Sequence, residues 1–147
     1  MDRTGTTRNK DLVLIRKIRP LQAEIEALED REKWERTRMA KLTQQISPMP
    51  RGGGGGRGMD EALEALEEIQ ERHRLLIAAY RRQVIRAERV LAGLESEQLR
   101  ALVRLKYMEG MPDSTVRVRL GISRFHFEAA VREMEAAERL EFVKWRE

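Results

Sequence analysis

The sequence predicts an all-α protein: a long two-helix hairpin or coiled coil followed by a carboxyl-terminal helix-turn-helix domain. Apolar residues recur at three- and four-residue steps through two long segments, as expected for one face of a helix. A stretch rich in proline and glycine, residues 47–58, separates the two segments. From residue 96 onward, shorter helical patterns are divided by glycine-containing turns, which is typical of a helix-turn-helix.

The composition favours long solvated helices over a large globular core. Charged residues make up 37% of the 147-residue chain and aromatic residues only 5%. The net charge is +4, divided as +5 over residues 1–58, −2 over 59–95 and +1 over 96–147. Cysteine is absent, which excludes disulfides and thiolate metal sites. No apolar run approaches the roughly 20 residues of a membrane span, so we expect a soluble, cytoplasmic protein without a membrane partner.

The amino-terminal part is expected to hold one long helix. Residues 1–10 are polar and aperiodic, which predicts a disordered arm. Residues 11–46 are the first long helix, in which Pro20 either introduces a kink or marks the true start after a separate turn. Trp34 lies off the apolar seam and is expected to pack on a neighbouring helix. The seam comprises Ile18, Leu21, Ile25, Leu28, Met39, Leu42 and Ile46, with Glu32 and Glu35 at its two middle steps.

Residues 47–58 are interpreted as a linker and residues 59–95 as the second long helix. The linker's glycines do not have the spacing of a phosphate-binding loop, and no strand pattern precedes them. His73 falls on the apolar face of the second helix without another ligand at helical spacing, so a structural histidine is favoured over a metal site. That face comprises Ala62, Leu66, Ile69, His73, Leu76, Tyr80, Val84, Ala87, Leu91 and Leu94.

Residues 96–147 are interpreted as the helix-turn-helix domain. Gly110 is expected to end the first short helix in a left-handed conformation, with Pro112 in the first turn of the next. Gly121 is expected to end that second helix. Ser123 is expected to cap the third by accepting a hydrogen bond from an N–H in its first turn.

Residues 105–110 read LKYMEG, Val116 follows, and residues 120–123 read LGIS. This pattern resembles that of region four of sigma factors and of the small phage late-gene regulators of the RinA and ArpU type, which share it. The resemblance implies a sequence-specific regulator of phage or prophage late genes in the cytoplasm of a bacterial host. The implied partners are double-stranded DNA, RNA polymerase and a second copy of the chain, with a dimer favoured. The helical arm would serve self-association or polymerase contact.

In a helix-turn-helix, the third helix enters the major groove with its amino-terminal part towards the bases. With Phe127 and Val131 buried, Arg124 is the favoured guanine contact and Arg132 a base or phosphate contact. Glu128 is expected to accept from a cytosine amino group. The complete expected DNA-binding set is Arg104, Arg117, Arg119, Ser123, Arg124, His126, Glu128 and Arg132, of which Arg104, Arg117 and Arg119 face phosphates.

Two other functions remain open from the sequence. One is a phage small terminase subunit, which would assemble as a ring and recognise packaging DNA. The other is a structural helical adaptor that binds no nucleic acid. No nucleophile stands near either histidine, His73 or His126, so we expect no enzymatic activity, no catalytic residue and no cofactor.

Overall fold

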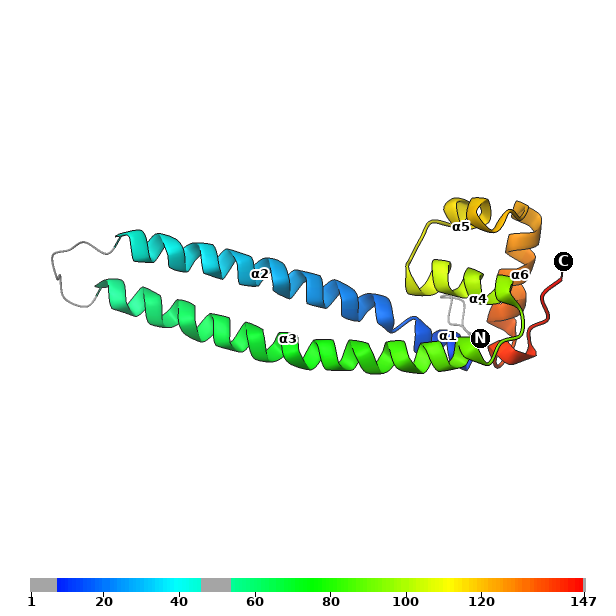
Figure 1. Cartoon of the computed structure of the whole chain (residues 1–147), viewed down its shortest axis with the longest axis horizontal. Coiled ribbons are helices and arrows are strands. Elements are labelled where there is room, and N and C mark those ends of the chain that lie inside the picture. The colour runs from blue at the N-terminus through cyan, green and yellow to red at the C-terminus, as the bar shows by residue number, and fades with distance from the viewer. Residues whose placement is uncertain (1–7, 46–53, 147) are drawn as a thin grey trace. The chain divides into compact units, whose positions relative to one another are not determined.

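The protein is all-helical over residues 8–45 and 54–146, the ranges that the computed structural model describes. The predicted all-α class is therefore confirmed. Figure 1 shows the helices, coloured in chain order. Ser96 and Ser123 stand immediately before α4 and α6 as their N-caps. The elements are α1 (Lys10–Ile15), α2 (Ile18–Gln45), α3 (Gly54–Ala92), α4 (Glu97–Val103), the π-helical turn η1 (Arg104–Met108), α5 (Asp113–Leu120), α6 (Arg124–Ala136) and the 3-10 turn η2 (Leu140–Phe142).

The chain divides into two compact units. The first, called here the core unit, combines the residues up to Pro20 with those from Tyr80 onward. The second, the arm unit, is Leu21–Ala79. Both α2 and α3 therefore contribute to each unit, and each unit is described by itself below.

In the arm unit, α2 and α3 run antiparallel (Figure 1). His73 Nε2 lies 3.1 Å from Glu29 Oε2, whereas the backbone at Gly58 lies against the side chain of Leu42. Residue numbers thus rise along one helix as they fall along the other. The contact with Glu29 agrees with the structural role expected for His73.

Over the described residues, the apolar seam of α2 follows the predicted one, including its acidic positions, whereas Ile46 lies outside the described residues. Ile25 is buried, and Glu35 is only 4% exposed although it carries a carboxylate. Its Oε2 atom has no hydrogen-bond partner among the described residues. The expectation that Trp34 packs on a neighbouring helix is wrong, because its side chain is 61% exposed. Among the described residues, its only ring contact is with the guanidinium of Arg38. A position next to the seam on a two-helix arm has no third helix to cover it.

The predicted linker is wrong at its carboxyl end, because α3 begins at Gly54 rather than at Met59. Glycine is less favourable than alanine in a helix by about 1 kcal/mol per residue. Extension of an existing helix nevertheless needs no new nucleus, and each added residue gains a backbone hydrogen bond. The rest of the predicted linker lies outside the described residues.

The predicted disordered arm, residues 1–10, is wrong at its last residues. Asn9 is fully buried and caps α1, its Oδ1 accepting from the N–H groups of Asp11 (2.9 Å) and Leu12 (3.2 Å). Its Nδ2 donates to the carbonyl of Met134 at 2.8 Å. Residues 1–7 lie outside the described ranges.

The expected single helix over 11–46 is likewise corrected, because it is two helices separated by Arg16 and Lys17. Pro20 stands in the first turn of α2, where its missing N–H has no intrahelical partner to lose. The alternative of a separate first turn therefore describes the chain better than a kinked helix.

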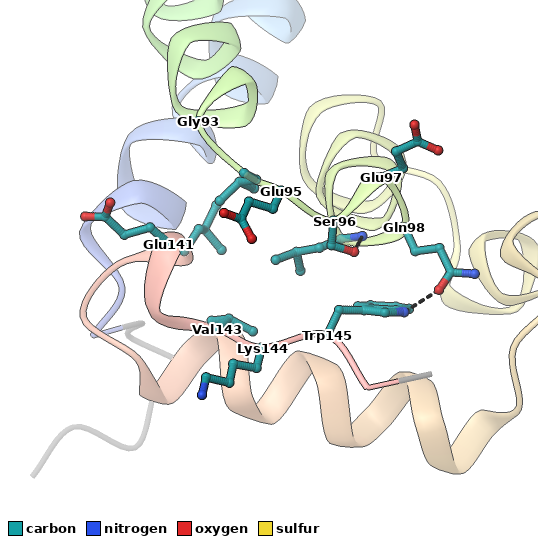
Figure 2. A pocket seen from close by; sticks show the side chains of 12 residues that line it. Gly93, Glu95, Ser96, Glu97, Gln98, Glu141, Val143, Lys144 and Trp145 are labelled. Atoms are coloured by element: carbon teal, nitrogen blue, oxygen red, sulfur yellow. Dashed lines mark hydrogen bonds between the residues drawn. The ribbon is translucent and has the colours of Figure 1, made fainter.

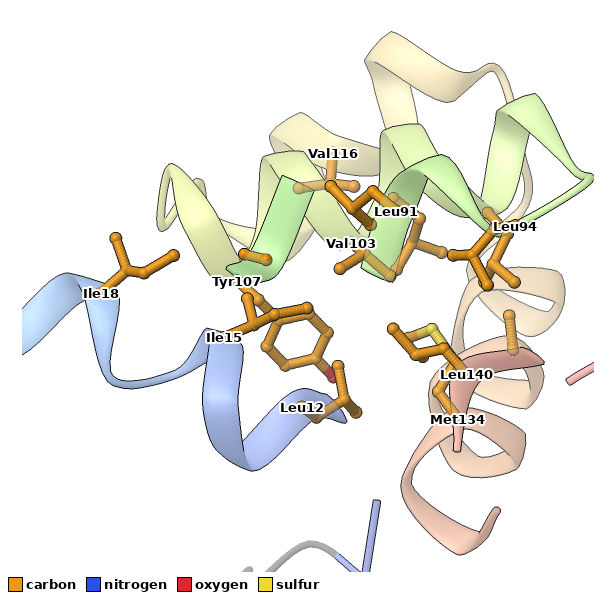
Figure 3. Close-up of a cluster of buried hydrophobic side chains, with 14 of the residues drawn as sticks. Leu12, Ile15, Ile18, Leu91, Leu94, Val103, Tyr107, Val116, Met134 and Leu140 are labelled. Carbon is orange, nitrogen blue, oxygen red and sulfur yellow. The ribbon is translucent and has the colours of Figure 1, made fainter. Parts of the chain in front are cut away.

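The hydrophobic core of the core unit draws on both ends of the sequence (Figure 3). Leu12 and Ile15 of α1 are fully buried together with Leu102 of α4 and Met134 of α6. Burial of one such side chain stabilises a fold by about 1.5–3 kcal/mol. The predicted domain, residues 96–147, is therefore too narrow, because α1 and the end of α3 contribute to the same core. The remaining core members are Ile18, Ala87, Leu91, Leu94, Leu99, Val103, Tyr107, Val116, Phe127, Ala130 and Leu140.

Candidate nucleic-acid interface

The approach to α5 is set by a π-helical turn and a left-handed glycine. In η1, the N–H of Glu109 donates to the carbonyl of Arg104 at 2.9 Å, one residue further back than in an α-helix. Gly110 then takes φ 68°, which confirms the expected left-handed conformation. A Cβ at this position would lie 2.6 Å from Arg19 Nε, near the end of a flexible and exposed side chain that can move aside, so it is the backbone angle that favours glycine.

The turn between α5 and α6 is closed by backbone bonds and a serine cap. Gly121 takes φ 67°, and its N–H donates to the carbonyl of Val118 at 3.2 Å. Ser123 Oγ accepts from the N–H of His126 at 3.1 Å, which confirms the predicted cap. Pro112 was expected in the first turn of the second short helix, but it precedes α5 as its N-cap residue.

α6 has one buried face and one exposed face. Phe127, Ala130 and Met134 are buried, at the three- and four-residue steps of a single helix face. Val131 was expected to be buried but is half-buried, since Ala130 and Met134 occupy the centre of that face. Arg124, Glu128 and Arg132 are exposed, as expected from their positions on the opposite side.

Arg124 and Glu128 form an exposed ion pair. Arg124 Nε lies 2.9 Å from Glu128 Oε1, and the two side chains are 78% and 52% exposed. Solvent-exposed pairs four residues apart on a helix contribute about 0.3–0.5 kcal/mol, so a competing anion can displace the glutamate. Arg117, Arg119 and Arg132 form no ion pair with any residue in the described ranges.

Arg104 has a different environment from the other expected phosphate contacts. Its guanidinium donates two hydrogen bonds to the carboxylate of Glu88 on α3, one of them at 3.0 Å. The hydrogen bond with Glu88 is also the main cause that raises the pKa of Arg104 above its usual value. This bidentate pair ties α4 and η1 to the end of α3.

His126 lies against the carboxyl-terminal tail of the chain. Its ring lies 5.0 Å from that of Trp145, with an angle of 41° between the ring planes. The Trp145 indole N–H donates to the side chain of Gln98 across an open groove (Figure 2). His126 is thereby half-buried by the tail, while Phe142 of the same tail is 63% exposed.

The sequence interpretation missed two exposed apolar side chains next to the turn. Phe125 of α6 is 79% exposed and Val118 of α5 is 80% exposed. A signal for Phe125 was present in the sequence. It stands two residues before Phe127, about 200° around a helix, so the two rings cannot both face the core.

The described residues offer no metal centre. No group of three or more His, Cys, Asp or Glu side chains is placed to hold a metal ion in residues 8–45 and 54–146. Over the same ranges, no helix combines the length and apolar character needed to cross a bilayer.

Comparisons of the chain with protein-family models, with curated proteins and with solved structures found no match.

Proposed function

We propose that this protein is a sequence-specific regulator that binds double-stranded DNA through α5, the turn at Gly121 and α6. The observation that carries the proposal is the exposed face of α6. Arg124, Glu128 and Arg132 project from this face, while Phe127, Ala130 and Met134 hold the opposite face in the core. A helix held in place by its buried face, with exposed arginines on its outer face, suits the major groove.

The arrangement around the turn supports a helix-turn-helix. A helix of 8 residues, α5, is followed by a left-handed glycine, a serine cap and a helix of 13 residues, α6. Each feature fixes the backbone without occupying the outer face of α6. Control of phage late genes is the part of the proposal that rests on resemblance, namely that of residues 105–110 and 120–123 to sigma region four and to the RinA and ArpU regulators.

The charges favour phosphate contacts from α5 and base contacts from α6. Arg119 is exposed and Arg117 half-exposed, and neither is neutralised by a described acidic residue. Arg124 can exchange the solvent-exposed Glu128 for a guanine edge, and Arg132 lies two turns further along the helix. Arg104 is better assigned to positioning, because Glu88 occupies its guanidinium.

We further propose that the arm unit mediates self-association or contact with RNA polymerase, with a dimer favoured. Trp34, Leu63 and Leu75 remain 61%, 43% and 54% exposed along α2 and α3. Apolar side chains of this size on one arm are a candidate protein-binding surface. A dimer would also match an operator with two-fold symmetry. The oligomer mass separates this proposal from a terminase, which requires a large ring.

The proposal is tested by the salt dependence of DNA binding. A duplex is first selected from a random library with the wild-type chain. Its dissociation constant is then measured by fluorescence anisotropy over a range of salt concentrations. Removal of one phosphate contact lowers the slope of log K against log salt by about 0.9. Arg119→Ala should produce this change, and Arg124→Ala with Arg132→Ala should abolish discrimination against a scrambled duplex.

The control is Arg36→Ala in the arm unit, where Arg36 is also exposed and pairs with Glu32 at 3.1 Å. The control should leave both the salt slope and the discrimination unchanged. If Arg36→Ala lowers the slope while Arg119→Ala does not, DNA binds elsewhere and the proposed interface is wrong.

A further inference from the structure

The exposed face of α6 contains an aromatic side chain at its centre. Phe125 and Arg132 are seven residues apart, which places them almost in line along the helix, with Glu128 and Ala129 between them. Phe125 is 79% exposed although it stands two residues from the buried Phe127. A large apolar side chain so placed loses the gain from burial unless something covers it.

The surroundings of Phe125 favour nucleic acid as the occupant. Arg124 precedes it, Arg132 follows it two turns later, and Arg119 of α5 is likewise exposed. Of the two acidic residues on this face, Glu128 is paired with Arg124, and Glu135, at the carboxyl end of the helix, is paired with Arg16. An apolar protein surface would leave the guanidinium groups of Arg119 and Arg132 without partners, whereas the phosphates that flank a DNA groove would neutralise them.

The major groove offers one apolar group for a side chain of this kind. It is the C5-methyl group of thymine, since the other base edges present hydrogen-bond donors and acceptors. A phenylalanine in the first turn of the helix that enters the groove reaches base edges, not only the backbone.

We propose that Phe125 is a specificity-determining residue that reads thymine by packing its ring on the C5-methyl group. This inference rests on the proposed DNA-binding function and adds a base preference to it. Arg124 and Arg132 then supply polar contacts on either side of an apolar one.

The test replaces thymine by deoxyuracil, which lacks only the methyl group, one position at a time in the selected duplex. For the wild-type chain, uracil at one or two positions should weaken binding about fourfold, the factor expected for loss of one buried methyl-sized group. Phe125→Ala should bind the thymine and uracil forms equally. Phe125→Leu should retain part of the difference, because leucine still offers apolar surface.

Val118→Ala is the matched control, since Val118 is 80% exposed but lies on α5. It should keep the wild-type response to uracil. Thermal unfolding should be unchanged in all three variants, because both side chains are solvent-exposed. The inference is overturned if uracil affects the wild type and Phe125→Ala equally or affects neither. It is also overturned if Phe125→Ala leaves DNA binding intact and abolishes association with another protein.

Failure of the proposed function gives a different result. In that case no duplex is enriched from the random library, and the wild type does not discriminate between sequences. If a duplex is selected but replacement of thymine by uracil does not change its affinity, the proposed function stands and only the role of Phe125 is refuted.

Discussion

Replacement of Asn9 by alanine should destabilise the core unit far more than its place near the chain terminus suggests. The side chain caps α1 through two backbone N–H groups and donates to the carbonyl of Met134 on α6. Loss of an asparagine cap costs about 1 kcal/mol. A buried carbonyl left without a donor costs about 1–3 kcal/mol more. The free energy of unfolding should therefore fall by about 2–4 kcal/mol, the sum of these two costs.

Asn9→Asp keeps the cap and removes the donor to Met134. Aspartate is as good a cap as asparagine, but it cannot donate to the carbonyl of Met134. Its cost should therefore exceed about 1–3 kcal/mol, the carbonyl contribution, because a buried carboxylate would also face that carbonyl oxygen. Lys10→Ala is the control for a neighbouring residue, because the Lys10–Glu138 pair is more than 60% exposed on both sides and should change stability little.

Urea unfolding can report the core unit specifically. The chain has two tryptophans, of which Trp34 lies in the arm unit and is 61% exposed. In a Trp34→Phe background, the fluorescence follows Trp145, whose ring lies 5.0 Å from that of His126 in the core unit. If Asn9→Ala is as stable as this background to within about 0.5 kcal/mol, the range expected for a neutral surface change, residues 8–15 do not belong to the core.

Three further predictions concern single residues. Glu35→Leu should raise the free energy of unfolding of the arm unit by about 1–3 kcal/mol, because it removes a buried carboxylate oxygen that has no hydrogen bond and only the charge of Arg38 at 3.7 Å; a loss of stability in urea unfolding would show that the pair with Arg38 satisfies this carboxylate. Burial raises the pKa of Tyr107 to about 12, so the neutral phenol is favoured in the fold. The associated stability is complete below about pH 10 and is lost towards pH 12, by up to about 3 kcal/mol. Tyr107→Phe should remove this alkaline loss, and equal pH profiles for the two chains would contradict it. Gly110→Ala and Gly121→Ala should each cost about 1–2 kcal/mol from their positive φ, because the exposed Arg19 side chain near Gly110 can move aside; unchanged melting temperatures would contradict the left-handed conformation at these two turns.

The features that were predictable from the sequence are those set by local chemistry. Gly110, Gly121 and Ser123 have the conformations expected of them, because helix ends select glycine and serine for reasons confined to a few residues. The seam of α2 was also predictable, even where Glu35 interrupts it, since helical periodicity places a residue on a face regardless of its charge.

The features that were missed depend on contacts between distant parts of the chain. Asn9 reads as part of a polar terminus, and only its bond to Met134 shows that it belongs to the core. Arg104 was expected to contact phosphate, because nothing near it in the sequence indicates its pairing with Glu88, which lies sixteen positions earlier on another helix. Trp34, off the seam, was expected to pack on a neighbouring helix, but the helix pair offers it no neighbour.

The most direct test of the central claim is retention of fragmented DNA from the genome that encodes this protein, sequenced at two salt concentrations. The account predicts one enriched site upstream of a block of genes, retained at the higher salt concentration and lost with Arg124→Ala and Arg132→Ala. Enrichment beside a packaging gene would favour a terminase instead. Weak retention without any enriched site, vanishing at moderate salt, would contradict sequence-specific binding and leave α5 and α6 with a structural role.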